Sequence, residues 1–142
     1  MKKIIFLGIV FIGLISGIRW ALSSGQLLTW IDENPEAGWV PSVGYWVGTT
    51  YALANLPEKA AIYFEHTLAN IPSDHALAYK LHFRLANAYD DIGRRKEAFR
   101  EFETVVYDYP ENKFTEICIN RLKMGDVSVD TKRIGKGKPF AW

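Results

Sequence analysis

Residues 79–112 read YKLHFRLANAYDDIGRRKEAFREFETVVYDYPEN, and apolar residues recur in this stretch at helical spacing. The stripe positions are Leu81, Leu85, Tyr89 and Ile92 in the first half and Ala98, Phe102, Val105 and Val106 in the second. Gly93 lies between the two stripes, where a glycine that can adopt a left-handed backbone ends a helix. Pro110 ends the second stripe, because proline cannot extend a helix. The stretch therefore predicts a helical hairpin.

This hairpin resembles a tetratricopeptide repeat, a unit of 34 residues built as helix–turn–helix. Counted from Tyr79, the residues on the signature positions of the family are Leu85, Ala86, Tyr89, Ala98, Phe102 and Pro110. Ala86 stands where the family prefers glycine, and Val105 replaces the usual second small residue. The resemblance implies an all-α fold in which such hairpins stack into a solenoid.

A second match to the same pattern starts at Pro41. Its signature residues are Val47, Gly48, Tyr51, Ala60, Phe64 and Pro72. A lone hairpin cannot bury its apolar face, so two hairpins in register support each other. The pattern predicts helices over residues 43–55 and 57–70, with Pro57 in the first turn of the second helix.

The two matches are 38 residues apart rather than 34, so the chain carries four extra residues, 75–78. We expect them to extend the start of the following helix by one turn. Ser42 and Asp74 are the predicted N-caps of the first helix of each hairpin. After Pro110, an amphipathic segment that ends at Gly125 predicts the closing helix that a short array needs.

The composition excludes several classes of protein. The chain has 142 residues and a formal net charge of +1, which does not fit a nucleic-acid-binding protein. Cys118 is the only cysteine, so there is no disulfide within the chain and no cysteine metal cluster. We interpret Cys118 as a core residue on the apolar stripe of the closing helix rather than as a nucleophile.

The sequence contains no constellation that indicates catalysis. His75 and His82 are seven residues apart, whereas metal ligands on one helix usually lie three or four apart. His66 follows Glu65 directly, and adjacent side chains on a helix diverge. We therefore expect no enzyme, no metal, no cofactor and no small-molecule substrate.

Residues 1–25 differ in character from the rest of the chain. Residues 4–18 are uncharged and mostly apolar, and Arg19 and Trp20 follow them. This pattern predicts either a cleavable signal peptide or a single transmembrane helix, and the Arg–Trp pair favours the retained anchor because it suits a membrane interface. The retained anchor predicts a single-pass protein of a bacterial cytoplasmic (inner) membrane, and the two N-terminal lysines place its N-terminus in the cytoplasm and the repeats in the periplasm.

Within this predicted anchor, Gly13 and Gly17 are four residues apart. Small residues let two helix backbones approach closely in lipid. The two glycines are therefore the candidate residues for packing against another membrane helix, although glycine is also common in such helices.

Two further segments flank the predicted repeat domain, which spans residues 41–125. Residues 26–40 form a predicted connector whose Trp30 and Trp39 either lie at the membrane surface or cap the first repeat. Residues 126–142 have no helical period and contain four basic and two aromatic residues. This tail is either flexible or ordered by a partner protein or an acidic membrane surface.

In the family that the chain resembles, the first helix of each repeat lines a groove that holds a peptide or a partner surface. On the matching positions, the candidate partner-binding residues are Tyr45, Trp46, Thr49, Lys80, Arg84 and Asn87. A strip of cations and an amide beside an aromatic patch can accept a carboxylate together with an apolar side chain. The same pattern also fits a solvated helix face without a ligand.

These features together predict a non-catalytic accessory or scaffold subunit of a bacterial membrane protein complex. It would bind partner proteins through its repeats and its anchor. The alternative is a periplasmic chaperone or assembly factor that binds client chains transiently. The tetratricopeptide components of cytochrome c maturation and the anchored repeat proteins near the secretion translocon are examples that the resemblance suggests.

Overall fold

A computed structural model describes residues 10–13, 16–17, 20, 25–35 and 37–134 of the chain. Within these ranges every regular element is a helix, which agrees with the all-α prediction. The helices are α2 (Gln26–Glu33), α3 (Val40–Leu53), α4 (Pro57–Ala69), α5 (Ala78–Asp91), α6 (Arg95–Asp108) and α7 (Thr115–Met124).

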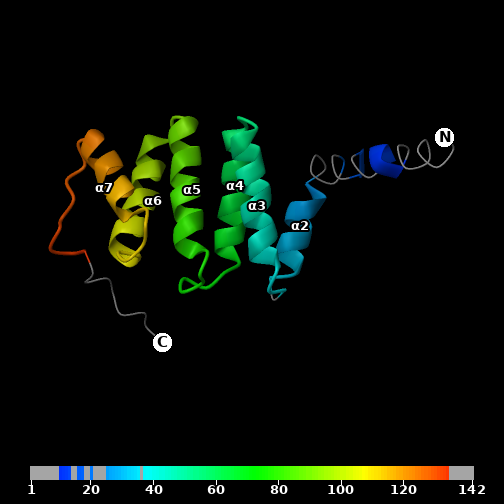
Figure 1. Cartoon of the computed structure of the whole chain (residues 1–142), viewed down its shortest axis with the longest axis horizontal. Helices are drawn as coiled ribbons and strands as arrows, with labels where there is room; N and C mark the ends of the chain where they lie inside the picture. Colours follow the sequence, from blue (N-terminus) through cyan, green and yellow to red (C-terminus); the bar gives the residue numbers. More distant parts are fainter. Residues whose placement is uncertain (1–9, 14–15, 18–19, 21–24, 36, 135–142) are drawn as a thin grey trace.

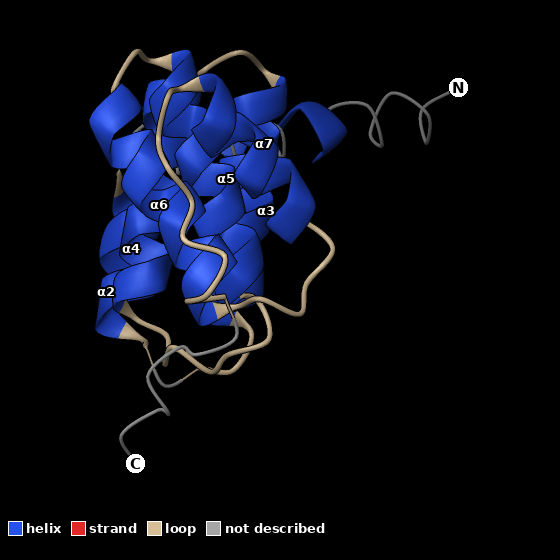
Figure 2. Ribbon diagram, turned by 90° about the vertical axis from the view of Figure 1, so that its left-hand side faces the viewer, coloured by secondary structure: helices blue, strands red, loops and turns tan. Residues whose placement is uncertain are grey.

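The helices form two layers. Helix α3 packs on α4, α4 on α5, α5 on α6, and α6 on α7, so each helix contacts the next one in the chain (Figure 1). Figure 2, which looks along the array, shows α2, α4 and α6 in one layer and α3, α5 and α7 in the other. Helix α2 contacts α4 within its layer. It therefore lies where the second helix of a preceding hairpin would lie.

The core fills the space between the layers. Phe64 and Phe102, one on the second helix of each hairpin, are almost completely buried among small residues such as Ala86 and Ala98. Gly48 lies on α3 opposite Phe64, and a Cβ atom built on this glycine would be 2.5 Å from Cε1 of the ring. The signature residues of the predicted repeats thus occupy the contacts between helices.

The observed helix ends agree in part with the predicted ones. Gly93 has a φ angle of 78°, as predicted for the turn between α5 and α6, and Pro57 lies in the first turn of α4. The predicted caps Ser42 and Asp74 are wrong. Helix α3 starts at Val40, so Ser42 lies inside it, and α5 starts only at Ala78, four residues after Asp74. Of the extra residues 75–78, the first three lie in the loop that precedes α5 and only Ala78 belongs to the helix, so they do not lengthen α5 by a turn.

Helix α2 caps the first hairpin through a small apolar cluster of its own. Ile31 of α2 and Val40 of α3 are buried against Tyr63 of α4. Trp30 and Trp39 stack with 4.5 Å between their ring centroids, and Trp30 packs on this cluster. Of the two roles predicted for these tryptophans, the structure places Trp30 in the cap, while Trp39 remains more than half exposed.

The prediction of a transmembrane helix and of a single-pass protein of the inner membrane is contradicted. No helix among the described residues is long and apolar enough to cross a membrane. The longest of them, such as α3, have 14 residues and span about 21 Å, whereas the hydrocarbon core of a bilayer is about 30 Å thick. Of the segment 1–25 that prompted the prediction, residues 1–9, 14–15, 18–19 and 21–24 lie outside the described part of the chain.

The first part of the predicted tail packs on the array, and we call residues 126–134 the strap. Val127, Val129 and Ile134 pack against the core cluster. The backbone N–H of Asp130 donates a hydrogen bond of 3.0 Å to the Tyr107 hydroxyl on α6. Residues 135–142 lie outside the described part.

Candidate protein-docking surface

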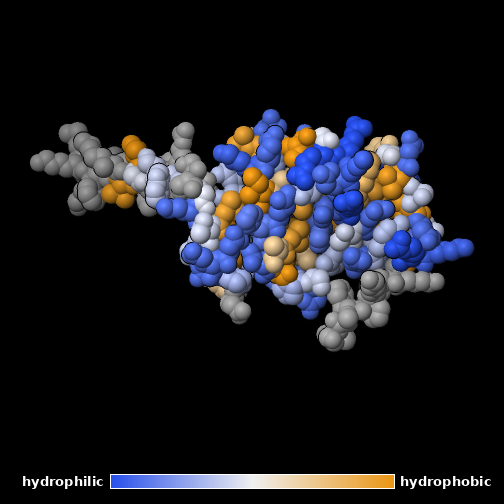
Figure 3. All heavy atoms as spheres, turned by 180° about the vertical axis from the view of Figure 1, so that it is seen from behind, coloured by the Kyte–Doolittle hydropathy of each residue, from blue (hydrophilic) through white to orange (hydrophobic). Residues whose placement is uncertain are grey.

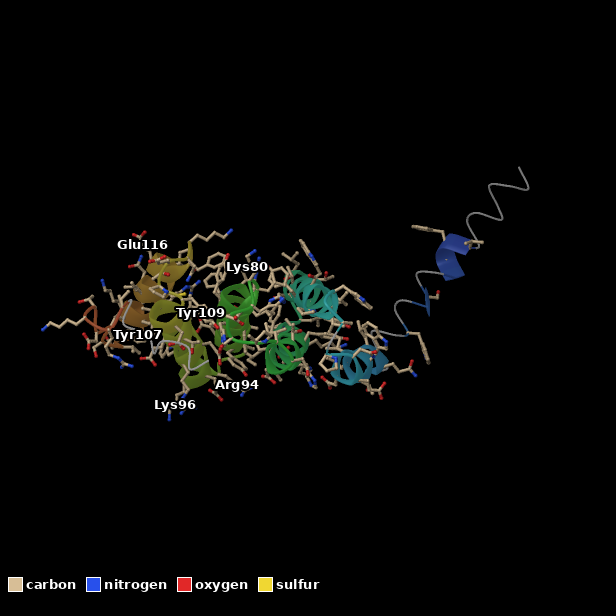
Figure 4. All side chains as sticks on the ribbon, turned by 90° about the horizontal axis from the view of Figure 1, so that it is seen from below. Lys80, Arg94, Lys96, Tyr107, Tyr109 and Glu116 are labelled. Carbon is tan, nitrogen blue, oxygen red and sulfur yellow. The ribbon has the colours of Figure 1, made fainter. Side chains whose placement is uncertain are left out.

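The predicted partner-binding residues come from α3 and α5, which are neighbours in the same layer. Figure 4 shows Lys80 of α5 on the side of this layer, opposite Arg94 and Lys96. We call the accessible part of α3 and α5 on this side the α3/α5 surface. The opposite face, over α2, α4 and α6, is mostly hydrophilic with narrow hydrophobic strips (Figure 3).

The α3 part of this surface is apolar and aromatic. Trp46 is 65% exposed, and its ring meets that of Tyr45 edge-on at 5.7 Å. Tyr45 is half-buried against the core, and its ring supports the exposed indole through this edge contact. Leu53, near the end of the same helix, is 82% exposed. Tryptophan is enriched at protein interfaces, so this part of α3 can offer an apolar contact to another molecule.

Thr49 differs from the other predicted residues, because it is only 6% exposed. Its hydroxyl is buried and has no hydrogen-bond partner among the described residues. A partner on the α3/α5 surface would therefore meet Trp46 and not Thr49.

The α5 part of the surface is cationic. Lys80 and Arg84 are both partly exposed, and neither has an ion-pair partner in the described part of the chain. The Lys80 ammonium lies 5.7 Å from the centre of the Tyr79 ring. Asn87 donates a hydrogen bond of 2.7 Å from its amide to the carbonyl of Phe83. The two cations are thus available for a carboxylate from another molecule.

Gly13 and Gly17, the residues predicted to pack against another helix, are both exposed. A Cβ atom built on either glycine meets no atom within 4 Å. Packing of the two glycines against a helix of another molecule therefore stays a prediction.

Side-chain pairs that the sequence did not reveal lie elsewhere on the array. Nδ1 of His82 is 2.6 Å from Oε2 of Glu101, which joins α5 to α6. Nδ1 of His66 is 2.9 Å from Oδ2 of Asp32, which joins α4 to α2. Both are pairs and not larger clusters: in the described ranges, no three metal-ligating side chains gather at one place. Their position between helices indicates a role in packing.

A pocket that the sequence analysis missed lies at the start of α5, beside the loop between α6 and α7. It has a volume of about 490 Å³ and is lined by Tyr79, Tyr109, Pro110, Glu111, Asn112 and Lys113. We call it the loop pocket. The Tyr109 hydroxyl donates a hydrogen bond of 2.6 Å to the carbonyl of Ser73, so the loops at this end are tied together. Burial raises the pKa of Tyr109, and the nearby charges of Asp108 and Asp74 raise it further.

The architecture and the surface define a class of protein: a short array of stacked helical hairpins with an aromatic and cationic face. Comparisons with models of known protein families, with curated proteins and with solved structures each found no match. The resemblance to tetratricopeptide repeats is therefore a prediction that rests on the residues of the two hairpins.

Proposed function

We propose that this chain is a non-catalytic scaffold or accessory subunit that binds a partner protein on the α3/α5 surface of a tetratricopeptide-type array. The main support is the position of the exposed Trp46 next to the helix that presents the unpaired cations Lys80 and Arg84. Tryptophan and arginine are the side chains most often responsible for binding energy at protein interfaces.

The chemistry of the surface suggests the chemistry of the partner. Arg84 can bind a carboxylate with two parallel hydrogen bonds, and Lys80 adds a second positive charge one helical turn away. Trp46 and Leu53 offer apolar contact on the neighbouring helix. A partner segment with an acidic residue next to an apolar side chain would satisfy both parts.

A selection from a displayed peptide library, with the full chain as bait, tests this proposal. We expect enriched peptides to combine Asp or Glu with an apolar residue. The variant Lys80→Glu/Arg84→Glu should lose these peptides, because two attractive charges become repulsive. The variant Lys96→Glu/Arg100→Glu makes the same change in net charge on α6, in the other layer, and should keep them. Enrichment that is the same for both variants would show that the α3/α5 surface is not the site.

The exposure of Leu53 favours a second candidate function, transient binding of client chains in the manner of a chaperone. An adaptable apolar contact suits many partners. Purification of the full chain from its native cells, followed by mass spectrometry, distinguishes the two functions. A subunit should bring one or two proteins at a fixed ratio, whereas a chaperone should be mostly free or bound to a mixture.

A further inference from the structure

The loop pocket lies at the start of α5, at the edge of the α3/α5 surface, and its lining differs from that surface. The aromatic rings of Tyr79 and Tyr109 line it, together with the ring of Pro110. Its volume of about 490 Å³ falls in the range of roughly 300–1,000 Å³ that is usual for ligand sites. A flat apolar group can therefore stack inside it.

The surroundings of this pocket contain unpaired carboxylates. Glu111 lines the pocket, and the charges of Asp108 and Asp74 act on the phenol of Tyr109. Within the described residues, none of these three carboxylates takes part in an ion pair. Lys113 also lines the pocket, and Arg100 and Arg133 line a hollow together with Asp108, so Glu111 and Asp74 are the carboxylates at the rim of the pocket that can accept cations beside an apolar group.

The loop that forms the pocket is itself well fixed. The backbone N–H of Phe114 donates a hydrogen bond of 2.7 Å to the side-chain oxygen of Asn112. The Thr115 hydroxyl donates one of 3.0 Å to the carbonyl of Pro110. A binding site whose shape exists before binding loses less conformational entropy when it is filled.

The strap leads toward this end of the array. The Arg133 guanidinium lies 4.7 Å from the centre of the Tyr107 ring, and Arg133 lines a surface hollow together with Asp108. Tyr109 is only two residues further along than Tyr107. Figure 4, which looks at this end, labels Tyr107, Tyr109 and Lys80 in order from the strap toward the middle of the array.

We propose that residues 135–142 of this chain, GKGKPFAW, dock in the loop pocket. The ring of Phe140 or Trp142 would stack between Tyr79 and Tyr109, and the two lysines of the segment would lie beside the carboxylates of the rim. Phe140 is six residues beyond Ile134, a reach of about 20 Å in extended chain, and Arg133 already contacts the ring of Tyr107, two residues before Tyr109.

Tethering strengthens such a contact. A short flexible linker raises the effective concentration of the attached segment to the millimolar range. Even weak stacking and charge attraction then suffice to fill the pocket for much of the time. Tethering therefore favours the segment of the same chain over that of a second copy.

Paramagnetic broadening in the full chain tests the proposal. A nitroxide is attached to Gly137→Cys in a Cys118→Ala background, and ¹⁵N amide signals are recorded. We expect strong broadening of the amides of Tyr79, Glu111 and Asn112, and little at Leu53, which lies at the other end of α3. Replacing both Phe140 and Trp142 with alanine should remove most of the broadening at the pocket.

Two controls make the result decisive. Glu111→Lys should reduce the broadening because it reverses a charge of the rim, whereas Glu116→Lys makes the same change on α7 and should not. A mixture of ¹⁵N chains without nitroxide and spin-labelled chains without ¹⁵N should show no broadening at the pocket. Broadening in this mixture would assign the pocket to a second copy and overturn docking within one chain. Pocket amides that stay sharp in every sample, or that broaden equally without the two rings, would overturn docking altogether.

Discussion

The hydroxyl of Tyr89 on α5 donates a hydrogen bond of 2.5 Å to Oε1 of Glu65 on α4, and this bond joins the two helical hairpins. The guanidinium of Arg94 lies 4.3 Å from the centre of the Tyr89 ring, and its Nη1 is 3.8 Å from the same Glu65 oxygen. Burial, followed by the bond to Glu65, raises the pKa of Tyr89 well above its usual value. The phenol is therefore a neutral donor at physiological pH.

Replacing Tyr89 with phenylalanine should lower the free energy of unfolding by about 1–3 kcal/mol, because the Glu65 carboxylate loses a donor at the junction of the hairpins. Urea unfolding followed by circular dichroism measures this change. Tyr45→Phe is the matched control, since its hydroxyl has no hydrogen-bond partner in the described structure and its removal should cost little. An equal loss in both variants would mean that the bond to Glu65 does not contribute measurably to the free energy of unfolding.

The buried thiol of Cys118 should make the free energy of unfolding depend on pH in alkaline solution. Burial raises the pKa of its thiol from 9.0 to about 12, so the folded chain keeps a proton that the unfolded chain releases. The stabilisation is fully present below pH 9 and is lost as the pH rises from there toward 12. The free energy of unfolding should fall by about 1.4 kcal/mol for each pH unit in this window.

The comparison between the original chain and Cys118→Ala isolates this effect. Urea unfolding under reducing conditions at pH 8 and at pH 10.5 gives the slope for each chain. We expect a smaller slope in Cys118→Ala, even if the cavity lowers its stability at both pH values. The tyrosines contribute equally to both slopes and cancel. Identical slopes would mean that the thiol ionises as easily in the folded chain as in the unfolded one.

The sequence predicted helix ends well where the backbone conformation of a single residue determines the end. The turn at Gly93 needs a positive φ angle, and Pro57 suits only a first helical turn, so both effects are local. The predicted caps Ser42 and Asp74 failed because a capping side chain competes with packing. Helix α3 starts at Val40, which is buried against α2, a contact that local sequence does not reveal.

The candidate site was predictable to a smaller extent. Helical spacing was enough to place Lys80 and Arg84 on one side of α5, whereas the burial of Thr49 depends on neighbouring helices. The bond between Tyr89 and Glu65 joins residues 24 positions apart on different helices, so no local pattern indicates it. The loop pocket likewise exists only because Tyr79 meets a loop some thirty residues later in the chain.

Gly48 should not tolerate a larger side chain, although alanine usually stabilises a helix. A Cβ atom at this position would be 2.5 Å from the Phe64 ring, so α3 and α4 would have to move apart. We expect Gly48→Ala to lower the free energy of unfolding by about 1–3 kcal/mol, as overpacking does. Gly38→Ala is the control, since its Cβ would meet nothing within 4 Å. A more stable Gly48→Ala protein would show that the helices are packed less closely than described.

Asp32 should determine whether α2 stays attached to the array. Its carboxylate accepts a hydrogen bond of 3.0 Å from the Asn70 amide and lies 2.9 Å from Nδ1 of His66, so α2 is held to α4 by polar contacts as well as by Ile31. The pair is partly exposed, and its loss should cost only about 0.5–1 kcal/mol. A helix of eight residues is marginal by itself, so this loss should open α2 locally while the rest of the fold persists.

Amide hydrogen exchange of Asp32→Ala, compared with Glu33→Ala, measures this local opening. Glu33 is the next residue on the same helix and has no side-chain bond in the described structure, so its replacement removes the same charge without breaking a contact to α4. We expect the amides of α2 to exchange several-fold faster in Asp32→Ala only, with α5 and α6 unchanged in both variants. Faster exchange that spreads equally to α5 and α6 would instead make α2 part of one cooperative unit with the hairpins. Unchanged exchange in α2 would mean that the apolar cluster around Ile31 is sufficient to hold the helix.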